Sequence, residues 1–160
     1  MTSSNVYDSI IARLRANNVS FTIHEHEVAR TVLDAETKLP FPKEQFLKTV
    51  VFKIKHSSWI LAAVKGQDSV DYRKLAEAFG VKRADLVRPA PEEVEAALGM
   101  QIGGVGPIAL NAETRVVVDS GVQSMDIVYC GVGRNDRTLE IRLADLIQVA
   151  DARVLPIVRD

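Results

Sequence analysis

The feature of this chain that most suggests chemistry is the sequence GGVGP at residues 103–107. Glycines allow successive backbone N–H groups to point into one concavity, which can hold a carbonyl oxygen, a carboxylate or a phosphate. A tight connection that uses glycine only to turn is the more common explanation of such a loop. The loop matches neither a phosphate-binding P-loop nor a dinucleotide fingerprint, so by itself it identifies no ligand.

Lys48 is a second candidate for a functional side chain, because it lies at the start of the strongest strand pattern, TVVFKI at 49–54. A lysine ammonium in that position could receive a phosphate or a carbonyl oxygen as a compact point charge. A solvated lysine at the end of a strand is the ordinary alternative. The residue alone does not decide between the two.

The histidines, the cysteine and one arginine give weaker signals. His24 and His26 lie two apart on a predicted strand and could form a metal pair, but no further ligand at suitable spacing completes a site, so we expect no metal. Cys130 has no Cys–His signature around it, which favours a small pocket-lining residue over a nucleophile. Arg134, after two glycines, is either a surface charge or a contact for an anionic ligand.

Composition limits the class of protein. The chain has 160 residues, of which 47% are hydrophobic and 26% charged, as expected for one globular domain spanning residues 1–160. A net charge of -1 excludes the global basic field that attracts DNA. The single cysteine fits a reducing compartment, and neither a signal peptide nor an apolar run of membrane-spanning length is found. We therefore expect a cytoplasmic protein without a membrane or DNA partner.

Hydrophobic periodicity predicts the elements that must position these residues. Helical patterns cover 7–16, 31–38, 72–79, 91–98 and 144–150, and strand patterns cover 20–24, 49–54, 59–64, 115–119, 126–133 and 138–143. The short KHSS connection at 55–58 predicts that the second and third strands form an antiparallel hairpin. Residues 84–90 read as a short extended segment, and 154–160 as either a closing strand or a packed tail. The order indicates a single compact α+β domain with a mixed, largely antiparallel sheet flanked by helices.

Several stretches, taken together and in order, resemble the YbaK-type aminoacyl-tRNA deacylases, which are free-standing relatives of the editing domain of bacterial prolyl-tRNA synthetases. The matching stretches are HEVARTVLDAE (26–36), FLKTVVFK (46–53), WILAAVKGQDSVDYRKLAEAFG (59–80), GGVGPIAL (103–110) and CGVGRNDRTLEIRLADL (130–146). Each stretch is weak alone, but the ordered set covers nearly the whole chain. The resemblance implies a barrel-like sheet with a central pocket and hydrolysis of the ester between an amino acid and tRNA, without a cofactor.

The resemblance also assigns site residues. Lys48 matches the key lysine of the family, and Thr49 follows it as in many members. The loop of Gly103, Gly104, Val105, Gly106 and Pro107 matches the loop that binds the substrate carbonyl, with the amide of Gly104 and its neighbours as donors. This would answer why the chain places three glycines there.

The resemblance indicates less directly which amino acid the pocket selects. His26 and Thr31 match a pattern that lines the amino-acid pocket in several relatives, although Thr31 also reads as a helix N-cap and both roles can coexist. Cys130 stands where relatives have serine or histidine, which leaves the amino acid open. A small side chain such as alanine, serine, threonine or cysteine is the expected class.

The leading prediction is thus a trans-editing hydrolase that clears mischarged tRNA, with the acceptor end of aminoacyl-tRNA as partner and an aminoacyl-tRNA synthetase as a further candidate. A non-catalytic module that binds tRNA or a synthetase is the alternative. A third reading, a redox sensor, requires Cys130 to be an exposed thiol of low pKa.

Overall fold

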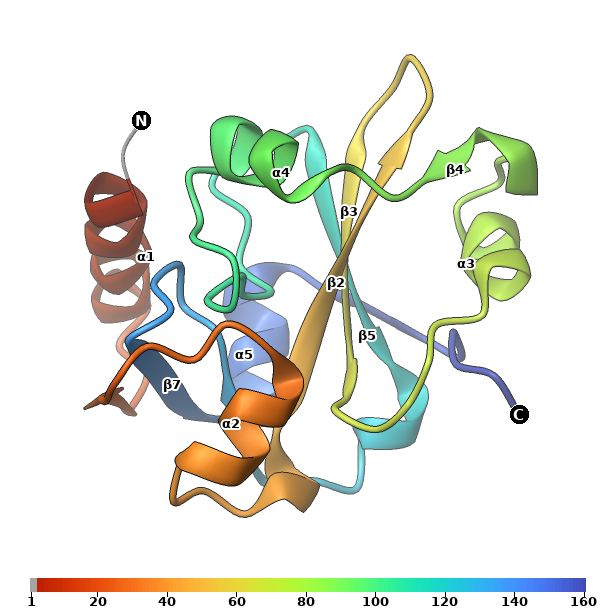
Figure 1. The fold of residues 1–160 in the computed structure, drawn as a ribbon. Helices are drawn as coiled ribbons and strands as arrows, with labels where there is room; N and C mark the ends of the chain where they lie inside the picture. Colours follow the sequence, from red (N-terminus) through yellow and green to blue (C-terminus); the bar gives the residue numbers. More distant parts are fainter. Residues whose placement is uncertain (1–2) are drawn as a thin grey trace.

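The computed structural model describes the backbone of residues 3–160 and their side chains except those of residues 3, 4, 32 and 36, and its strands form two sheets (Figure 1). The smaller sheet is antiparallel throughout, in the order β1 (Phe21–Glu25), β7 (Arg137–Arg142), β6 (Ile127–Cys130). The larger sheet has the order β4 (Leu86–Val87), β2 (Leu47–Ile54), β3 (Trp59–Lys65), β5 (Thr114–Asp119), β8 (Arg153–Leu155). In it β2 is antiparallel to both neighbours, whereas β5 pairs parallel with β3 and β8. An isolated bridge between Phe46 and Tyr129 joins the two sheets.

The helices lie around these sheets. They are α1 (Ser3–Ala16), α2 (Val32–Lys38), α3 (Tyr72–Ala78), α4 (Pro91–Leu98) and α5 (Leu143–Ala150), with single 3₁₀ turns at η1 (Lys43–Gln45), η2 (Arg83–Asp85) and η3 (Ser120–Val122). Figure 1 shows α1 and α3 on opposite sides of the molecule, with β2 and β3 crossing between them. No helix among the described residues is long and apolar enough to cross a membrane.

The predicted α+β class and its largely antiparallel pairing are confirmed. Thr31 and Asp71 cap α2 and α3, since each side chain accepts a hydrogen bond from a first-turn amide. The β2–β3 hairpin is also confirmed, and His56 in its turn has a φ of 58°. The expected strand at 126–133 is shorter, Ile127–Cys130, and Gly133 beyond its end takes a φ of 103° that extended pairing does not allow.

Other boundaries also differ from the sequence prediction. The extended segment at 84–90 is a 3₁₀ turn followed by the two-residue strand β4. Both readings for the C-terminus hold in part: Val154 and Leu155 belong to β8, which adds to β5 in parallel, and the residues after it form a tail whose Ile157 is buried in the cluster around α3. A parallel edge strand could not be read from so short a segment, because its partner lies more than thirty residues away.

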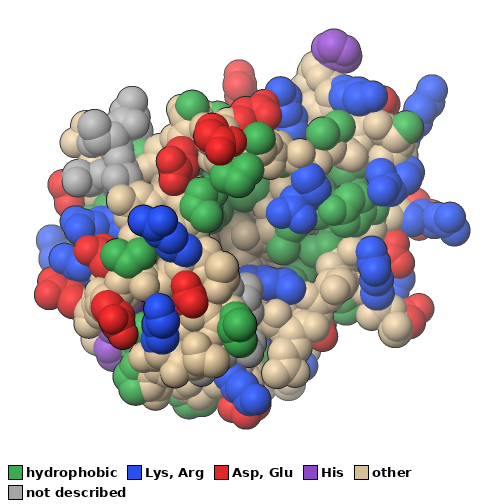
Figure 2. Space-filling view, in the orientation of Figure 1, with side chains coloured by type: hydrophobic (Ala, Val, Ile, Leu, Met, Phe, Trp, Pro, Cys, Tyr) green, Lys and Arg blue, Asp and Glu red, His purple; other side chains and the backbone are tan. Residues whose placement is uncertain are grey.

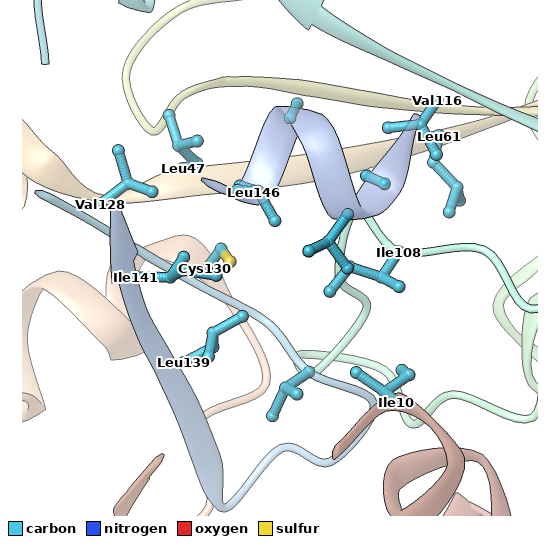
Figure 3. Packing of buried hydrophobic residues seen from close by; sticks show 14 of the residues in the cluster. Ile10, Leu47, Leu61, Ile108, Val116, Val128, Cys130, Leu139, Ile141 and Leu146 are labelled. Atoms are coloured by element: carbon cyan, nitrogen blue, oxygen red, sulfur yellow. The ribbon is translucent and has the colours of Figure 1, made fainter. Parts of the chain in front are cut away.

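Two hydrophobic clusters lie on opposite faces of the larger sheet because side chains alternate along β2 and β3. Phe52, Ile60 and Ala62 face the cluster that includes Leu75 of α3. Leu47, Val51, Leu61 and Ala63 face the other, to which α1 contributes Val6, Ile10, Ile11 and Leu14, as its spacing predicted. Figure 3 shows the second cluster, with the sulfur of Cys130 among Ile141, Leu139 and Leu146. A third, small cluster consists of Ala29, Ala35 of α2 and Leu39 at the C-terminal end of α2.

Candidate active site

A pocket of about 360 Å³ lies against β2, between α2, α4 and the loop at 103–107. Figure 2 shows the corresponding face of the molecule, which is hollowed near its centre and has Lys and Arg side chains around the hollow. Six residues predicted for the site line this pocket: His26, Thr31, Lys48, Thr49, Gly103 and Val105. They come from three separate stretches of sequence, 26–36, 46–53 and 103–110, which the fold brings together.

Lys48 and Thr49 are consecutive residues of β2, and both are partly buried. Lys48 pairs with Val64 of β3 in register, so its backbone is fixed by the hairpin. The hydroxyl oxygen of Thr49 is buried and has no hydrogen-bond partner among the described residues. A buried hydroxyl without a partner is costly, and one that lines a pocket is well placed for a ligand.

Three arginines that sequence reasoning missed also line the pocket: Arg30, Arg88 and Arg137. Arg88 lies over the ring of Phe52, with 5.4 Å between its guanidinium carbon and the ring centroid. Arg137 is held by Asp136 at 3.1 Å and by Glu25 at 3.4 Å. Among the described lining residues there is no aspartate or glutamate, and the charged side chains, Lys48 and the three arginines, are all positive. That charge suits the phosphate and the polarised carbonyl of a nucleotide ester.

His26 is held in one orientation by bonds to both ring nitrogens. Its Nδ1 lies 2.6 Å from the carbonyl oxygen of Glu27, and its Nε2 lies 2.8 Å from Oγ1 of Thr138. Because a carbonyl can only accept, the neutral ring carries its proton on Nδ1 and accepts from the Thr138 hydroxyl at Nε2. His26 therefore shapes the pocket wall with Thr138, another lining residue that the sequence did not indicate.

Thr31 combines the two roles that the sequence left open. Its Oγ1 accepts a hydrogen bond from the Asp34 amide at 3.0 Å and so caps α2. The same residue lines the pocket. His24, by contrast, is absent from the lining and bonds Glu140 through Nε2 at 2.8 Å. The two histidines considered as a metal pair are thus engaged by different protein groups, and no metal-binding cluster of three His, Cys, Asp or Glu occurs among the described residues.

The three glycines at 103, 104 and 106 are explained by close backbone packing. Gly103 has a φ of 88°, and a Cβ on it would collide with the backbone of Ala29 and Arg30. A Cβ on Gly104 would collide with the backbone of Arg134, and one on Gly106 with Gly131. The loop is therefore clamped between residues 29–30 on one side and residues 131–135 on the other.

The expected role of Gly104 as the principal amide donor requires correction. Its N–H donates to the carbonyl of Gln101 at 2.9 Å, and its own carbonyl accepts from the Gly133 amide at 2.6 Å. Gly104, Gly106 and Pro107 are buried and do not line the pocket. Gly103 and Val105 are the loop residues that face it. The loop thus reaches the pocket through Gly103 and Val105, while the Gly104 amide points into the turn toward Gln101.

Cys130 and Arg134 also lie outside the pocket. Cys130 is fully buried, and burial raises the pKa of its thiol to about 12, so it is neither the pocket-lining residue expected nor a poised nucleophile. Arg134 makes two hydrogen bonds of 3.0 Å to the carboxylate of Asp136 and lies over the ring of Tyr7. Both residues fix the smaller sheet and the 131–135 loop, against which the glycine loop packs.

Comparison with known proteins identifies the family of this chain. The model of the aminoacyl-tRNA editing domain family matches residues 26–149, which is most of the chain. The chain belongs to this family. The match begins at His26 in the pocket wall and extends into α5, so it includes every lining residue of the pocket.

Curated relatives of this editing domain are proline–tRNA ligases. That of Exiguobacterium sibiricum is 29% identical over 137 residues, which cover 80% of this chain and 23% of the ligase. That of Streptococcus equi subsp. equi is 28% identical over 137 residues, covering 79% of this chain and 22% of the ligase. The chain therefore spans less than a quarter of the length of these relatives.

Solved structures show the same fold. A protein described as a candidate trans-editing enzyme for prolyl tRNA synthetase superposes with a TM-score of 0.81 and 21% identity, covering 97% of this chain and 98% of that one. The hypothetical protein APE2540 gives a TM-score of 0.83 and 22% identity, covering 94% and 99%. The editing-domain fold can thus make up almost an entire solved chain.

Proposed function

We propose that this protein hydrolyses the ester bond of mischarged aminoacyl-tRNA that carries a small amino acid. The observation that carries the proposal is the single pocket in which Lys48, Thr49, His26 and Thr31 meet the glycine loop, in a member of the aminoacyl-tRNA editing domain family. The names of its relatives, which concern prolyl-tRNA synthetase, support the same class of substrate.

Binding of the acceptor end would use the positive side chains around the pocket. Lys48, Arg88 and Arg30 are suited to the terminal phosphate and the ester end of the tRNA, which approach from solvent. Because the protein as a whole has a net charge of -1, contact would be confined to a few phosphates. The proposal therefore includes weak, salt-sensitive binding of tRNA, and it places the protein in the cytoplasm, where charged tRNA is used.

The chemical step needs no nucleophile from the protein, because an aminoacyl ester is already activated. Water attacks the ester carbonyl carbon, negative charge develops on the carbonyl oxygen, and the bond to the ribose oxygen then breaks. In our proposal the exposed edge of the loop at Gly103 and Val105 polarises the carbonyl, a role that is worth about 2.7–4 kcal/mol for one donor in a known oxyanion hole. The neighbouring ribose hydroxyl of the substrate assists the proton transfer, and free amino acid and uncharged tRNA leave.

A small amino acid fits the apolar part of the lining. Ala35, Leu39, Val51 and Val94 border the space, which must also admit part of the terminal ribose. Discrimination by one methylene in such a pocket is worth only about 1–3 kcal/mol, so several small side chains would be accepted. Cys130 takes no part in this selection in our proposal, because it lies in the core.

A panel of correctly and incorrectly charged aminoacyl-tRNAs tests the proposal, with the intact protein compared with Lys48→Ala. We expect release of one or a few small amino acids and a fall in kcat/KM on the order of 100-fold in the variant. Lys53→Ala is the matched control, because Lys53 is on the same strand but pairs with Glu93 at 2.7 Å, away from the pocket lining. Full activity of a folded Lys48→Ala protein would remove Lys48 from the mechanism. No release from any tRNA would favour the alternative, a non-catalytic module that binds tRNA or a synthetase.

A further inference from the structure

The outer edge of β2 contains a gap that opens onto the pocket. One edge of this strand pairs with β3 from Leu47 to Lys53. The other edge is covered at its beginning by the bridge from Phe46 to Tyr129 and at its end by β4, which pairs only with Lys53 and Ile54. Between these covers lie Thr49 and Val51, and both line the pocket.

Alternation along the strand determines which backbone groups face the gap. The Ile54 amide donates to Ser58 across the hairpin, whereas the Lys55 amide donates to Asp85 on the β4 side. In a strand, the N–H and C=O of one residue point to the same edge, and the next residue points to the opposite edge. Because the Ile54 backbone faces β3, the backbone groups of the other even-numbered residues of β2 face β3 as well. The backbone groups of the odd-numbered Thr49 and Val51 therefore face the gap. Outside the regular strand pairing, no backbone hydrogen bond from another described segment reaches either residue.

The side chain of Thr49 adds a hydroxyl to the backbone groups at the gap. Its Oγ1 is buried without a partner, whereas the other threonine hydroxyls of the described lining are engaged. Thr31 accepts from the Asp34 amide, and Thr138 bonds His26. Thr49 thus brings two acceptor atoms, its hydroxyl and its carbonyl oxygen, to one point of a pocket whose described lining has no carboxylate.

We propose that Thr49 binds the α-ammonium group of the aminoacyl ester through its carbonyl and hydroxyl oxygens. An ammonium has three donors and no acceptor, and with no acidic side chain in the described lining it requires neutral oxygens of this kind. Lys48 and Thr49 both line the pocket, although alternation directs their side chains to opposite faces of β2. The inference rests on the proposed function, since it assigns a subsite to the substrate of that pocket.

This subsite gives the pocket a means of rejecting N-blocked esters. A peptidyl or N-acylated ester has an uncharged amide nitrogen with at most one N–H, so it cannot satisfy both oxygens and also adds bulk at the gap. The protein is thereby expected to leave peptidyl-tRNA intact while it hydrolyses free aminoacyl esters.

Two non-hydrolysable ligands test the subsite by binding alone: 3′-(L-alanyl)amino-3′-deoxyadenosine and its 3′-(L-lactyl)amino analogue, in which a hydroxyl replaces the ammonium. We expect the intact protein to bind the alanyl ligand about tenfold or more tightly than the lactyl ligand, as for a hydrogen bond to a charged group. Thr49→Val should remove most of this preference by weakening the alanyl ligand only, whereas Thr49→Ser should retain it. Thr49→Val replaces by a methyl group a hydroxyl that has no hydrogen-bond partner among the described residues, so its Tm should equal or exceed that of the parent.

The outcomes separate this inference from the proposed function. Equal binding of both ligands by the intact protein, or an equal loss of both in Thr49→Val, overturns the inference even where tRNA esters are hydrolysed. A preference for the alanyl ligand that depends on Thr49, in a protein that hydrolyses no ester, retains the subsite and refutes the hydrolase. Binding of neither ligand at millimolar concentration refutes the subsite whatever the activity.

Discussion

Cys130 gives the sharpest test of whether its position determines specificity or packing. The side chain is fully buried, and burial raises the pKa of its thiol from an ordinary value of 9.0 to about 12. At pH 7 an ordinary thiol is therefore about 1% thiolate and that of Cys130 about 0.001%, a difference of roughly a thousandfold in the reactive form. Steric protection by the core slows the reaction further.

Labelling with a thiol reagent measures this directly. We expect Cys130 in the native protein to react at least about a thousandfold more slowly than in denaturant. Rapid labelling of the native protein would refute the assignment of Cys130 to the core and would revive the redox-sensor reading. The buried residues that surround the sulfur, such as Leu139 and Ile141, belong to the same cluster, so only opening of the core should expose it.

Substitution of the same residue separates stability from activity. Cys130→Ser places a hydroxyl in an apolar core, at a cost of about 1–3 kcal/mol in the free energy of unfolding. For a protein of this size that corresponds to a decrease in Tm of about 2–4 °C per kcal/mol. The value of kcat/KM for each amino acid should not change at a temperature where the variant is folded. A switch in the preferred amino acid without loss of stability would contradict the packing role.

Two further substitutions test the loop and the residues that support it. Gly103→Ala must adopt a φ of 88° and collide with the backbone of Ala29, so we expect a decrease in Tm together with at least a tenfold decrease in kcat/KM. Gly80→Ala is the control, because Gly80 also has a positive φ but no atom lies within 4 Å of its added Cβ; equal activity of both variants would argue against a shaped loop. For Asp136, burial raises its pKa, but the hydrogen bond and charge of Arg134 and the charge of Arg137 outweigh burial and hold the pKa below 3.8. Because the pKa of Asp136 is lower in the folded protein than in the unfolded chain, the carboxylate stabilises the fold above pH 3.8, and this stabilisation is lost as the pH falls further. We therefore expect Asp136→Asn to lower the free energy of unfolding at pH 7 and to match the parent in acid. Urea unfolding across a range of pH measures this. A stability difference that is constant with pH would contradict this account.

The amino-acid sequence by itself determined the local elements and the family. The apolar spacing of α1, the cap at Thr31 and the β2–β3 hairpin depend on residues close together in the chain, so their patterns could be read directly. The order of the motifs likewise indicated the editing-domain family, which the family model confirms.

Only the tertiary structure decided which residues share the pocket. Arg88 and Arg137 gave no signal in the sequence, because a surface arginine and a pocket arginine have the same local pattern. Cys130 and the Gly104 amide were assigned to the pocket by their position in a motif. In the structure, Cys130 is buried in the core, and the Gly104 amide donates to the carbonyl of Gln101 within a turn. The gap at Thr49 depends on where β4 and β6 stop covering β2, and that is set by packing between segments far apart in the chain.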